Sequence, residues 1–301
     1  MSGRRLPSQA GRRALITGAN TGLGFASASA LAAAGAQVVL AVRDLAKGRA
    51  AVERIGSEVP GARVELVRLD LADLASVAEA AAHLREQDPL HVLMNNAGVM
   101  MVPQPETTAD GFERQMGTNH LGHFALTAQL WPVLASNARV IQLSSIAHYG
   151  AGRLHQMLGT APGYTPMGAY GQSKLATALF GVELARRVQE AGSSVVSVVA
   201  HPGWSATELF TRDDGAGWSV KLARKATALA GSSPQEGARS QLFAATDPTV
   251  RNGDFIGPAL LARGAPKRAK LSVGARNEGD AAWLWDESAR LTQLDPDFVR
   301  A

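Results

Sequence analysis

The residues with the clearest chemical potential are a tyrosine and a lysine four positions apart, Tyr170 and Lys174. On a helix, residues at this spacing lie on one face, one turn apart. A free phenol has a pKa near 10 and is a poor acid or base at neutral pH, but a nearby ammonium group favours the phenolate and lowers that pKa. The pair is therefore suited to moving a proton to or from an oxygen atom, as hydride transfer to a carbonyl requires.

The choice of tyrosine can be checked by elimination, because the chain has only three. Tyr164 has no cation four residues on. Tyr149 has Arg153 at that spacing, but two glycines intervene and the segment should form a loop. Tyr170 remains, although a lone tyrosine and lysine at this spacing are often only a surface pair on a helix.

A glycine-rich turn follows the first predicted strand and precedes a helix. Its glycines, Gly18, Gly22 and Gly24, permit a tight turn and a close approach of a pyrophosphate to the backbone. The helix N-terminus then supplies N–H donors and a positive dipole. An ordinary tight turn would look similar, but the strand–turn–helix context favours a nucleotide site.

Apolar runs alternate with alanine-rich helical segments along the chain. Strands are expected over residues 13–17, 37–42, 63–69, 91–95, 139–143, 194–200 and 254–256. Helices are expected over residues 26–34, 46–55, 75–86, 118–134 and 170–189.

Continuous apolar strands separated by helices predict an α/β fold: a single doubly wound Rossmann domain with a mainly parallel sheet and helices on both faces. We expect residues 1–10 to form an N-terminal tail and residues 11–301 to form this domain, with irregular substrate loops at about 150–168 and 211–231. Ligands of such folds bind beyond the carboxyl ends of the strands.

Several motifs together resemble the short-chain dehydrogenase/reductase family. They occur in the family's order: T-G-x-x-x-G-x-G from Thr17, N-N-A-G from Asn95, a helical Asn119, Ser145 after a strand, Y-x-x-x-K at Tyr170, and P-G-x-x-x-T from Pro202. The long separation of Ser145 and Tyr170, the run Ser144-Ser145-Ile146-Ala147-His148 and the tail Trp283–Ser288 resemble its retinol-dehydrogenase-like, WW-domain-oxidoreductase-like branch.

The resemblance implies a catalytic set of Asn119, Ser145, Tyr170 and Lys174. Ser145, favoured over Ser144 by the family pattern, would hydrogen-bond the substrate oxygen, Lys174 would lie near the phenol and the cofactor ribose, and Asn119 would hold a water that links Lys174 to solvent. Taken alone, Ser145 could simply place a hydroxyl at the end of a strand, and Asn119 could form a hydrogen bond between two helices. The implied cofactor-binding residues are Gly18, Asn20, Thr21, Gly22, Leu23, Gly24, Arg43, Asp70, Leu71, Asn96, Ala97, Gly98, Tyr170, Lys174, Pro202, Gly203 and Thr207.

The choice between the two nicotinamide cofactors depends on the end of the second predicted strand. An acidic residue there would bind the ribose 2′-hydroxyl of NAD, whereas a basic residue would pair with the 2′-phosphate of NADP. The sequence has Arg43 followed by Asp44, so NADP(H) is favoured and NAD(H) stays an alternative. Asp70 could contact the adenine or simply cap the following helix.

The substrate implied is a small-molecule carbonyl or alcohol, bulky and apolar. Candidate contacts come from the irregular segments: His148 and Tyr164 on one side, and Trp204, Phe210 and Trp218 as a pocket or lid on the other. The competing interpretation is that these aromatic residues are edges of the core.

Composition excludes several other classes of protein. The 301 residues are 46% hydrophobic and carry a net charge of +4, spread without the dense basic stripe of a nucleic-acid-binding protein. There are no cysteines, which excludes disulfides and zinc–thiolate sites. His120 and His123 lack a carboxylate cluster, so no metal site is predicted. No signal peptide or membrane span is visible, and a cytoplasmic location is expected.

Two other functions fit parts of the pattern. A non-catalytic NADP(H)-binding sensor or scaffold would typically have lost Tyr170 or Lys174. A sugar-nucleotide epimerase or dehydratase of the related extended group would usually show another glycine spacing and a larger C-terminal domain. A homodimer through the helix at residues 170–189 is a further expectation from the resemblance, although Glu183, Arg186 and Arg187 make its second face polar.

Overall fold

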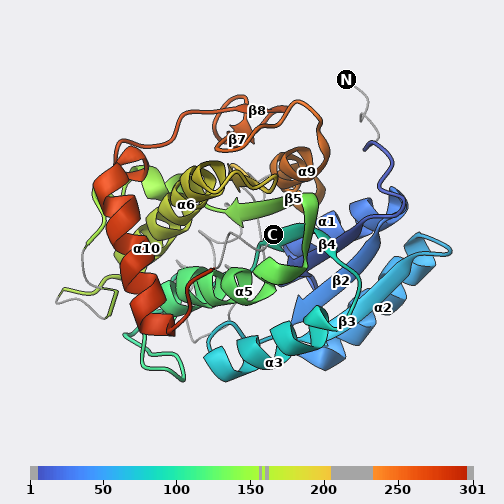
Figure 1. Ribbon diagram of the computed structural model, residues 1–301, viewed down its shortest axis with the longest axis horizontal. Coiled ribbons are helices and arrows are strands. Elements are labelled where there is room, and N and C mark those ends of the chain that lie inside the picture. The colour runs from blue at the N-terminus through green and yellow to red at the C-terminus, as the bar shows by residue number, and fades with distance from the viewer. Residues whose placement is uncertain (1–5, 156–157, 160–162, 205–232, 297–301) are drawn as a thin grey trace, which may run out of the picture.

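The computed structural model, which describes residues 6–155, 158–159, 163–204 and 233–296, is built on a sheet with the strand order β3-β2-β1-β4-β5-β6-β7-β8 (Figure 1). The strands are β1 Arg13–Thr17, β2 Gln37–Val42, β3 Arg63–Arg68, β4 Leu90–Asn95, β5 Leu134–Leu143, β6 Val196–Ala200, β7 Phe255–Pro258 and β8 Pro266–Arg268. All pairings are parallel except that of β7 with β8. The predicted doubly wound α/β fold is confirmed.

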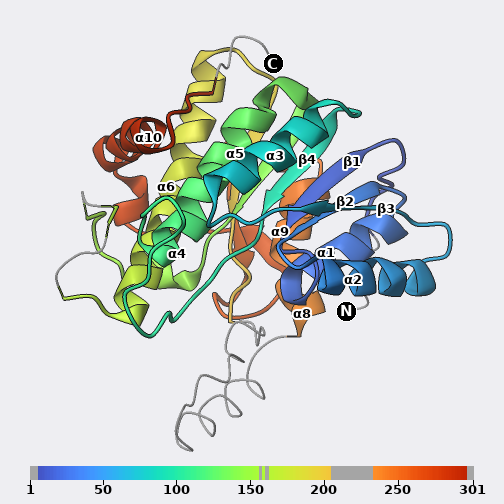
Figure 2. The same cartoon turned by 90° about the horizontal axis from the view of Figure 1, so that it is seen from below.

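Helices cover both faces of the sheet, as Figure 2 shows. One face carries α1 Gly22–Ala33, α2 Leu45–Glu58, α8 Pro234–Gly237 and α9 Arg239–Thr246; the other carries α3 Leu74–Arg85, α5 Gly122–Leu130 and α6 Pro166–Glu190. Each face has its own apolar core, one around Leu31 and Ile55 and the other around Leu84, Phe124 and Trp131. Burial on both faces explains why the strands are continuous apolar runs.

The strand order reverses between β1 and β4, and this reversal creates a crevice at the carboxyl ends of the strands. Strand β1 lies between β2 and β4, with Ile16 beside Leu40 on one side and beside Met94 on the other. All five residues of β1 are buried. The glycine-rich turn that leaves β1 therefore opens directly into this crevice.

The helix predicted over residues 118–134 is broken into several pieces. A short helix α4 (Arg114–Met116) continues into a π-helical turn (Gly117–Leu121), then α5, and then a 3-10 turn (Trp131–Val133). Pro132 ends the α-helix because it has no N–H to donate. The π-helical turn, a feature that often marks functional sites, contains Asn119.

A C-terminal helix that the sequence pattern did not reveal, α10 Glu278–Thr292, packs on α6 and α5 (Figure 1). Its Trp285 lies edge-on to Phe124 at 5.2 Å, and the guanidinium of Arg187 lies 4.5 Å from the Trp285 ring. Arg187 also pairs with the buried Glu183 at 2.8 Å. Helix α10 of the same chain thus covers α6 at Arg187.

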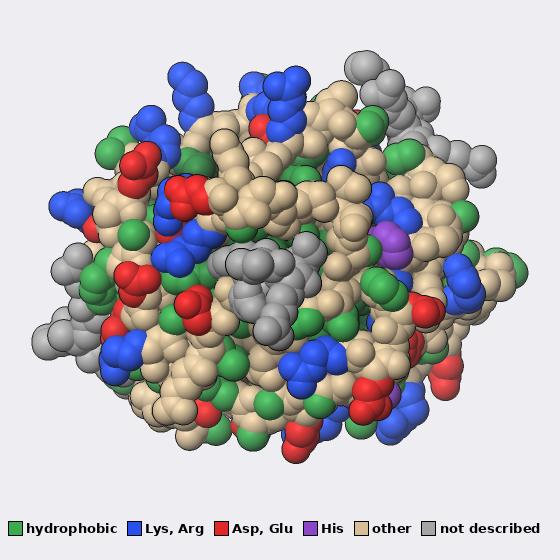
Figure 3. Space-filling view, in the orientation of Figure 1, with side chains coloured by type: hydrophobic (Ala, Val, Ile, Leu, Met, Phe, Trp, Pro, Cys, Tyr) green, Lys and Arg blue, Asp and Glu red, His purple; other side chains and the backbone are tan. Residues whose placement is uncertain are grey.

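The described part of the expected N-terminal tail lies against the domain. Leu6 packs on the core beside α1, and the backbone N–H of Gln9 donates to the carbonyl of Ala34 at 2.8 Å. Lys and Arg side chains are interspersed with Asp and Glu on the face shown in Figure 3. Among the described helices, none combines the length and the apolar character needed to cross a bilayer.

Candidate active site

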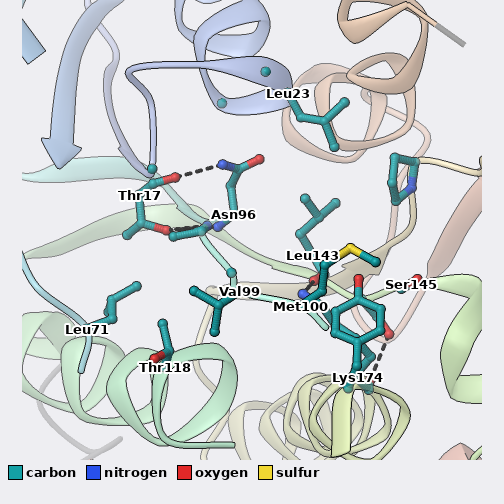
Figure 4. A pocket seen from close by; sticks show the side chains of 18 of the residues that line it. Thr17, Leu23, Leu71, Asn96, Val99, Met100, Thr118, Leu143, Ser145 and Lys174 are labelled. Carbon is teal, nitrogen blue, oxygen red and sulfur yellow. Dashed lines mark hydrogen bonds between the residues drawn. The ribbon is translucent and has the colours of Figure 1, made fainter. Parts of the chain in front are cut away.

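One cavity of about 970 Å³ lies at the carboxyl ends of the strands. Every described residue that the sequence assigned to cofactor binding lines it, and Thr207 lies outside the described residues. Figure 4 shows Thr17 and Asn96 in one part of the cavity and Ser145 and Lys174 in another. The fold thus brings motifs that are up to 185 positions apart, from Gly18 to Gly203, into one cavity.

The glycine-rich turn forms a tightly packed cradle. Gly18 and Gly22 have φ of 66° and 57°, which side chains rarely adopt. A Cβ on Gly24 would lie 2.5 Å from the Gly18 carbonyl oxygen and 2.6 Å from Nδ2 of Asn96. The absence of side chains at Gly18 and Gly24 lets the turn pack closely on Asn96 and Ala97 and places the start of α1 at the cavity, where its backbone N–H groups would suit a pyrophosphate.

The asparagine of the N-N-A-G motif fastens this cradle to strand β1. Nδ2 of Asn96 donates to the Thr17 carbonyl at 2.7 Å, and Oγ1 of Thr17 accepts from the N–H groups of Asn96 and Ala97, each at 2.9 Å (Figure 4). These bonds join two strands at the point where the strand order reverses. The loop after β4 is therefore fixed relative to the glycine turn.

At the nucleotide end, Arg43 and Lys47 line the cavity. The neighbouring carboxylate of Asp44 instead caps α2 by accepting from the N–H groups of Ala46 at 2.9 Å and Lys47 at 3.1 Å. These two bonds lower the pKa of Asp44. The carboxylate of Asp44 is thus engaged with its own helix, whereas Arg43 lies along the cavity.

Asp70 does not cap the following helix, which was one of its two expected roles. Asp73 caps α3, accepting from the N–H groups of Ala75 and Ser76. The carboxylate of Asp70 accepts from the N–H of Ala72 at 3.0 Å and lines the cavity, as Leu71 does.

At the opposite end, α6 presents Tyr170 and Lys174 to the cavity. The helix begins at Pro166 after Thr165, whose hydroxyl accepts from the N–H of Gly168, so it is longer than predicted. Nζ of Lys174 lies 5.9 Å from the centre of the Tyr170 ring. It donates to the carbonyl of Leu143 at the end of β5, at 2.9 Å.

The expectation that Lys174 lowers the pKa of Tyr170 is wrong for this structure. Burial raises the pKa of the Tyr170 phenol, and a hydrogen bond with Ser145 offsets this only in part. Burial also lowers the pKa of Lys174 to about 8. Desolvation therefore dominates the pKa of both buried groups, and the ammonium group of Lys174 is bound to the Leu143 carbonyl.

The two neighbouring serines have different partners. The hydroxyl of Ser144 is buried and donates to the main-chain carbonyl of Lys174 at 2.8 Å. Ser145 lies at the cavity, where its side chain bonds with Tyr170. Of the two, Ser145 is thus the one whose hydroxyl lies beside the phenol.

Asn119 is buried beside the cavity and does not line it. Its Oδ1 accepts from the N–H of Val99 at 2.7 Å, and its Nδ2 donates to the Val99 carbonyl and to Oγ of Ser173, each at 2.9 Å. Its main-chain carbonyl accepts from the Thr177 hydroxyl at 3.3 Å. Asn119 therefore ties the loop after β4 to α6, in the turn before Lys174.

Two of the expected substrate contacts lie away from the cavity. His148 is fully buried behind the Ser145 loop, and the hydroxyl of Tyr164 donates to the carbonyl of Val102 at 2.7 Å. Neither residue lines the cavity, and both side chains bond to the backbone of loops. Trp204 does line it and is half exposed. Phe210 and Trp218, with the loop at 211–231, lie outside the described residues.

His120 and His123 are packed in the interior. Nε2 of His120 lies 2.7 Å from Oγ of Ser288, and Nε2 of His123 lies 2.9 Å from Oγ1 of Thr17. Burial lowers the pKa of these histidines to about 3 and about 4. The described residues contain no group of three or more side chains suited to holding a metal ion.

Sequence reasoning missed several residues of the cavity wall. Lys47, Met100, Arg114 and Met167 line the cavity without belonging to any motif. Gln241 of α9 is buried and donates to Oδ1 of Asn96 at 3.1 Å. Spacing along the chain gives no signal for these residues.

The profile of the short chain dehydrogenase family matches residues 12–215. This chain belongs to the short-chain dehydrogenase family. It is 40% identical over 296 residues to polyprenol dehydrogenase of Mus musculus, which covers 95% of this chain and 85% of that protein. It is also 40% identical over 287 residues to retinol dehydrogenase 12 of Mus musculus, over 93% of this chain and 86% of that protein. A solved structure of an uncharacterized protein from Mycobacterium paratuberculosis is 40% identical, covers 97% of each chain and has a TM-score of 0.79.

These relatives confirm the predicted family and its retinol-dehydrogenase-like branch. The short-chain dehydrogenase described here is thus an oxidoreductase of the alcohol–carbonyl class that uses NAD(P).

The lowered pKa of Lys174 predicts a pH dependence of stability. Between about 8 and the ordinary value of 10.5, the folded chain binds fewer protons than the unfolded chain, so the free energy of unfolding rises with pH. Between pH 7 and pH 10, the free energy of unfolding of the wild type should rise by on the order of 2–3 kcal/mol more than that of Lys174→Met. Urea unfolding across this range measures it. A Lys47→Met control, which removes an exposed lysine, should follow the wild type; parallel curves for all three proteins would contradict the prediction.

Proposed function

We propose that this short-chain dehydrogenase is an NADP(H)-dependent enzyme that interconverts a bulky, apolar carbonyl compound and its alcohol, with Tyr170 as the proton-transfer group. The observation that carries the proposal is a single cavity that has the glycine cradle at one end and Ser145, Tyr170 and Lys174 at the other. A nicotinamide nucleotide bound in the cradle would reach the three polar side chains.

The cofactor supplies the hydride, and side chains of the protein transfer the proton. Because burial raises its pKa, the Tyr170 phenol keeps its proton at neutral pH and can donate it to the oxygen of a carbonyl as negative charge develops there. The Ser145 hydroxyl, bonded to that phenol, can hold the same oxygen. A protonated phenol can act as the acid in carbonyl reduction, so reduction is the direction to assay first.

Lys174 and Asn119 would restore the proton on Tyr170. Lys174 is buried with a pKa of about 8, so it can lose and regain a proton near neutral pH. Asn119 and Lys174 both lie beside Gly98: a Cβ there would be 3.1 Å from Oδ1 of Asn119 and 3.4 Å from Nζ of Lys174. This arrangement supports the relay from Lys174 to solvent that the family resemblance implies.

The apolar part of the cavity wall supports an apolar substrate. Near the catalytic end, its described residues include Val99, Met100, Leu143, Ile146 and Met167. Apolar surfaces favour ligands that are poorly hydrated. The names of the two mouse relatives refer to polyprenol and retinol, both apolar alcohols.

Cofactor preference rests on Arg43. Arg43 and Lys47 line the nucleotide end, while Asp44 is engaged in capping α2 and so competes less for a ribose hydroxyl. Charge-assisted hydrogen bonds to phosphate contribute about 1.5–3 kcal/mol. We expect Arg43→Ala to raise the Kd of NADPH about 10- to 100-fold and to change the Kd of NADH less than threefold.

Fluorescence titration of both cofactors on wild type, Arg43→Ala and Arg49→Ala tests this expectation. Arg49 is an exposed arginine of α2 that does not line the cavity, so its variant should bind NADPH as the wild type does. A wild type that prefers NADH, or an Arg43→Ala variant with unchanged NADPH affinity, would overturn the cofactor assignment. No binding of either cofactor would remove the basis of the proposed reaction.

A further inference from the structure

His148 lies behind the loop that carries Ser145 and is fully buried there. It belongs to the 3-10 turn Ile146–Tyr149, which Ser145 precedes. Its ring packs edge-on against Phe255 of β7, with 5.5 Å between ring centres. The side chain is therefore directed into the protein interior and cannot touch a substrate.

The hydrogen bonds of His148 fix its tautomer. The backbone N–H of Ser272 donates to Nε2 at 3.3 Å. A backbone amide can only donate, so Nε2 must be the nitrogen without a proton, and the ring proton lies on Nδ1. Nδ1 then donates to the main-chain carbonyl of Ser145 at 2.5 Å, an oxygen that also accepts from the backbone N–H of His148 at 3.1 Å. Burial, which lowers the pKa of His148, keeps the ring in this neutral form.

A second buried histidine bonds to the backbone of a second loop of the cavity, in this case as an acceptor. Nδ1 of His201 accepts from the N–H of Gly203 at 3.2 Å, and Gly203 lines the cavity beside Pro202. The His201 ring stacks on Phe255, with 5.2 Å between ring centres. One phenylalanine thus contacts two histidines, each bonded to the backbone of a loop that reaches the cavity.

We propose that His148 is a positioning residue for the carbonyl–alcohol reaction, whose Nδ1–H holds the Ser145 backbone so that the Ser145 hydroxyl stays against Tyr170. The inference rests on the proposed function of Ser145 and Tyr170. Only one other bond is described for the Ser145 side chain besides that with Tyr170, from the N–H of Ala147 at 3.2 Å. Because reacting groups displaced by about 1 Å can lose up to 100-fold in rate, the bond from His148 should matter for turnover.

Two substitutions of His148 separate the hydrogen bond from the bulk of the ring. His148→Phe keeps an aromatic ring against Phe255 but removes the Nδ1–H. His148→Asn has less bulk but restores an N–H donor close to the Ser145 carbonyl. With NADPH and decanal as the probe substrate, we expect kcat to fall about tenfold in the phenylalanine variant and to recover to within threefold of the wild type in the asparagine variant. The Kd of NADPH should stay within twofold in both.

His120→Phe is the matched control. His120 is equally buried, but its ring bonds to Ser288 of α10 rather than to a loop of the cavity. Its substitution should lower the thermal midpoint without changing kcat more than twofold. Unchanged kcat in His148→Phe, or an asparagine variant as slow as the phenylalanine variant, would overturn the proposal.

A spectroscopic measurement tests His148 independently of turnover. Ser145 lowers the pKa of Tyr170 through their hydrogen bond, so losing this bond should raise the pKa of that phenol. NMR titration of labelled tyrosine, in a chain that carries Tyr149→Phe and Tyr164→Phe, isolates Tyr170. We expect the pKa of Tyr170 to be higher in His148→Phe than in the wild type and to return to the wild-type value in His148→Asn. An unchanged pKa of the Tyr170 phenol in His148→Phe would contradict the positioning role of His148. If that pKa rises as expected but the wild type shows no turnover, the proposed reaction is overturned instead.

Discussion

Replacing Tyr170 with phenylalanine should lower kcat for carbonyl reduction by about 10²–10⁴-fold, the usual contribution of a general acid. The variant keeps the ring, which is nine-tenths buried against the cavity wall, and loses only the hydroxyl that bonds with Ser145. NADPH affinity should change less than threefold, because the cradle lies at the other end of the cavity. Steady-state kinetics with NADPH and decanal, together with cofactor titration, measure both quantities.

Tyr149→Phe is the control for this prediction. Tyr149 is partly exposed, does not line the cavity, and donates its hydroxyl proton to the carbonyl of Lys270. Its substitution should leave kcat within twofold. A Tyr170→Phe variant that retains full activity would show that the proton comes from another group. A wild type that binds NADPH tightly but reduces no aldehyde or ketone would favour the non-catalytic sensor or scaffold.

Replacing Gly24 with alanine should weaken NADPH binding by at least about 100-fold. The added Cβ would lie 2.5 Å from the Gly18 carbonyl, a backbone atom that can move only if the whole turn moves. Displacing that turn would remove two or more charge-assisted bonds from backbone N–H groups to the pyrophosphate, each contributing about 1.5–3 kcal/mol. Overpacking should also destabilise the fold by about 1–3 kcal/mol.

Gly56→Ala provides the matched control within a helix. Gly56 lies in α2, and a Cβ there would meet no atom within 4 Å. Alanine is the better helix former, so this variant should be more stable by about 0.5–1 kcal/mol and should bind NADPH normally. Isothermal titration and urea unfolding on both variants distinguish a local clash from a general effect of alanine. Normal NADPH binding by Gly24→Ala would contradict the cradle.

The order of the elements and the main motifs could be predicted from the sequence because their signals are local. Continuous apolar runs mark strands buried on both faces, and the glycines at 18, 22 and 24 mark a turn that only glycine can form. The start of α1 was placed four residues late, at Ala26 instead of Gly22, because a glycine-rich segment does not look helical.

The elements near the C-terminus were less predictable. Local sequence patterns do not identify α9, α10 or β8, because the stability of these elements depends on packing against distant partners. Helix α10, for example, is held on α6 by Trp285 and Arg187, which are 98 positions apart. Contacts of this kind leave no periodic trace in the segment itself.

The sequence by itself determined the family, the sheet of alternating strands and helices, and the residue types that gather where strands end. Only the tertiary structure decided how those residues are used. It turned Asp44 into a helix cap and left Arg43 along the cavity, buried His148 behind Ser145, and raised rather than lowered the pKa of Tyr170. The reason is physical: hydrogen-bond partners and desolvation depend on which distant segments pack around a side chain, and spacing along the chain does not record them.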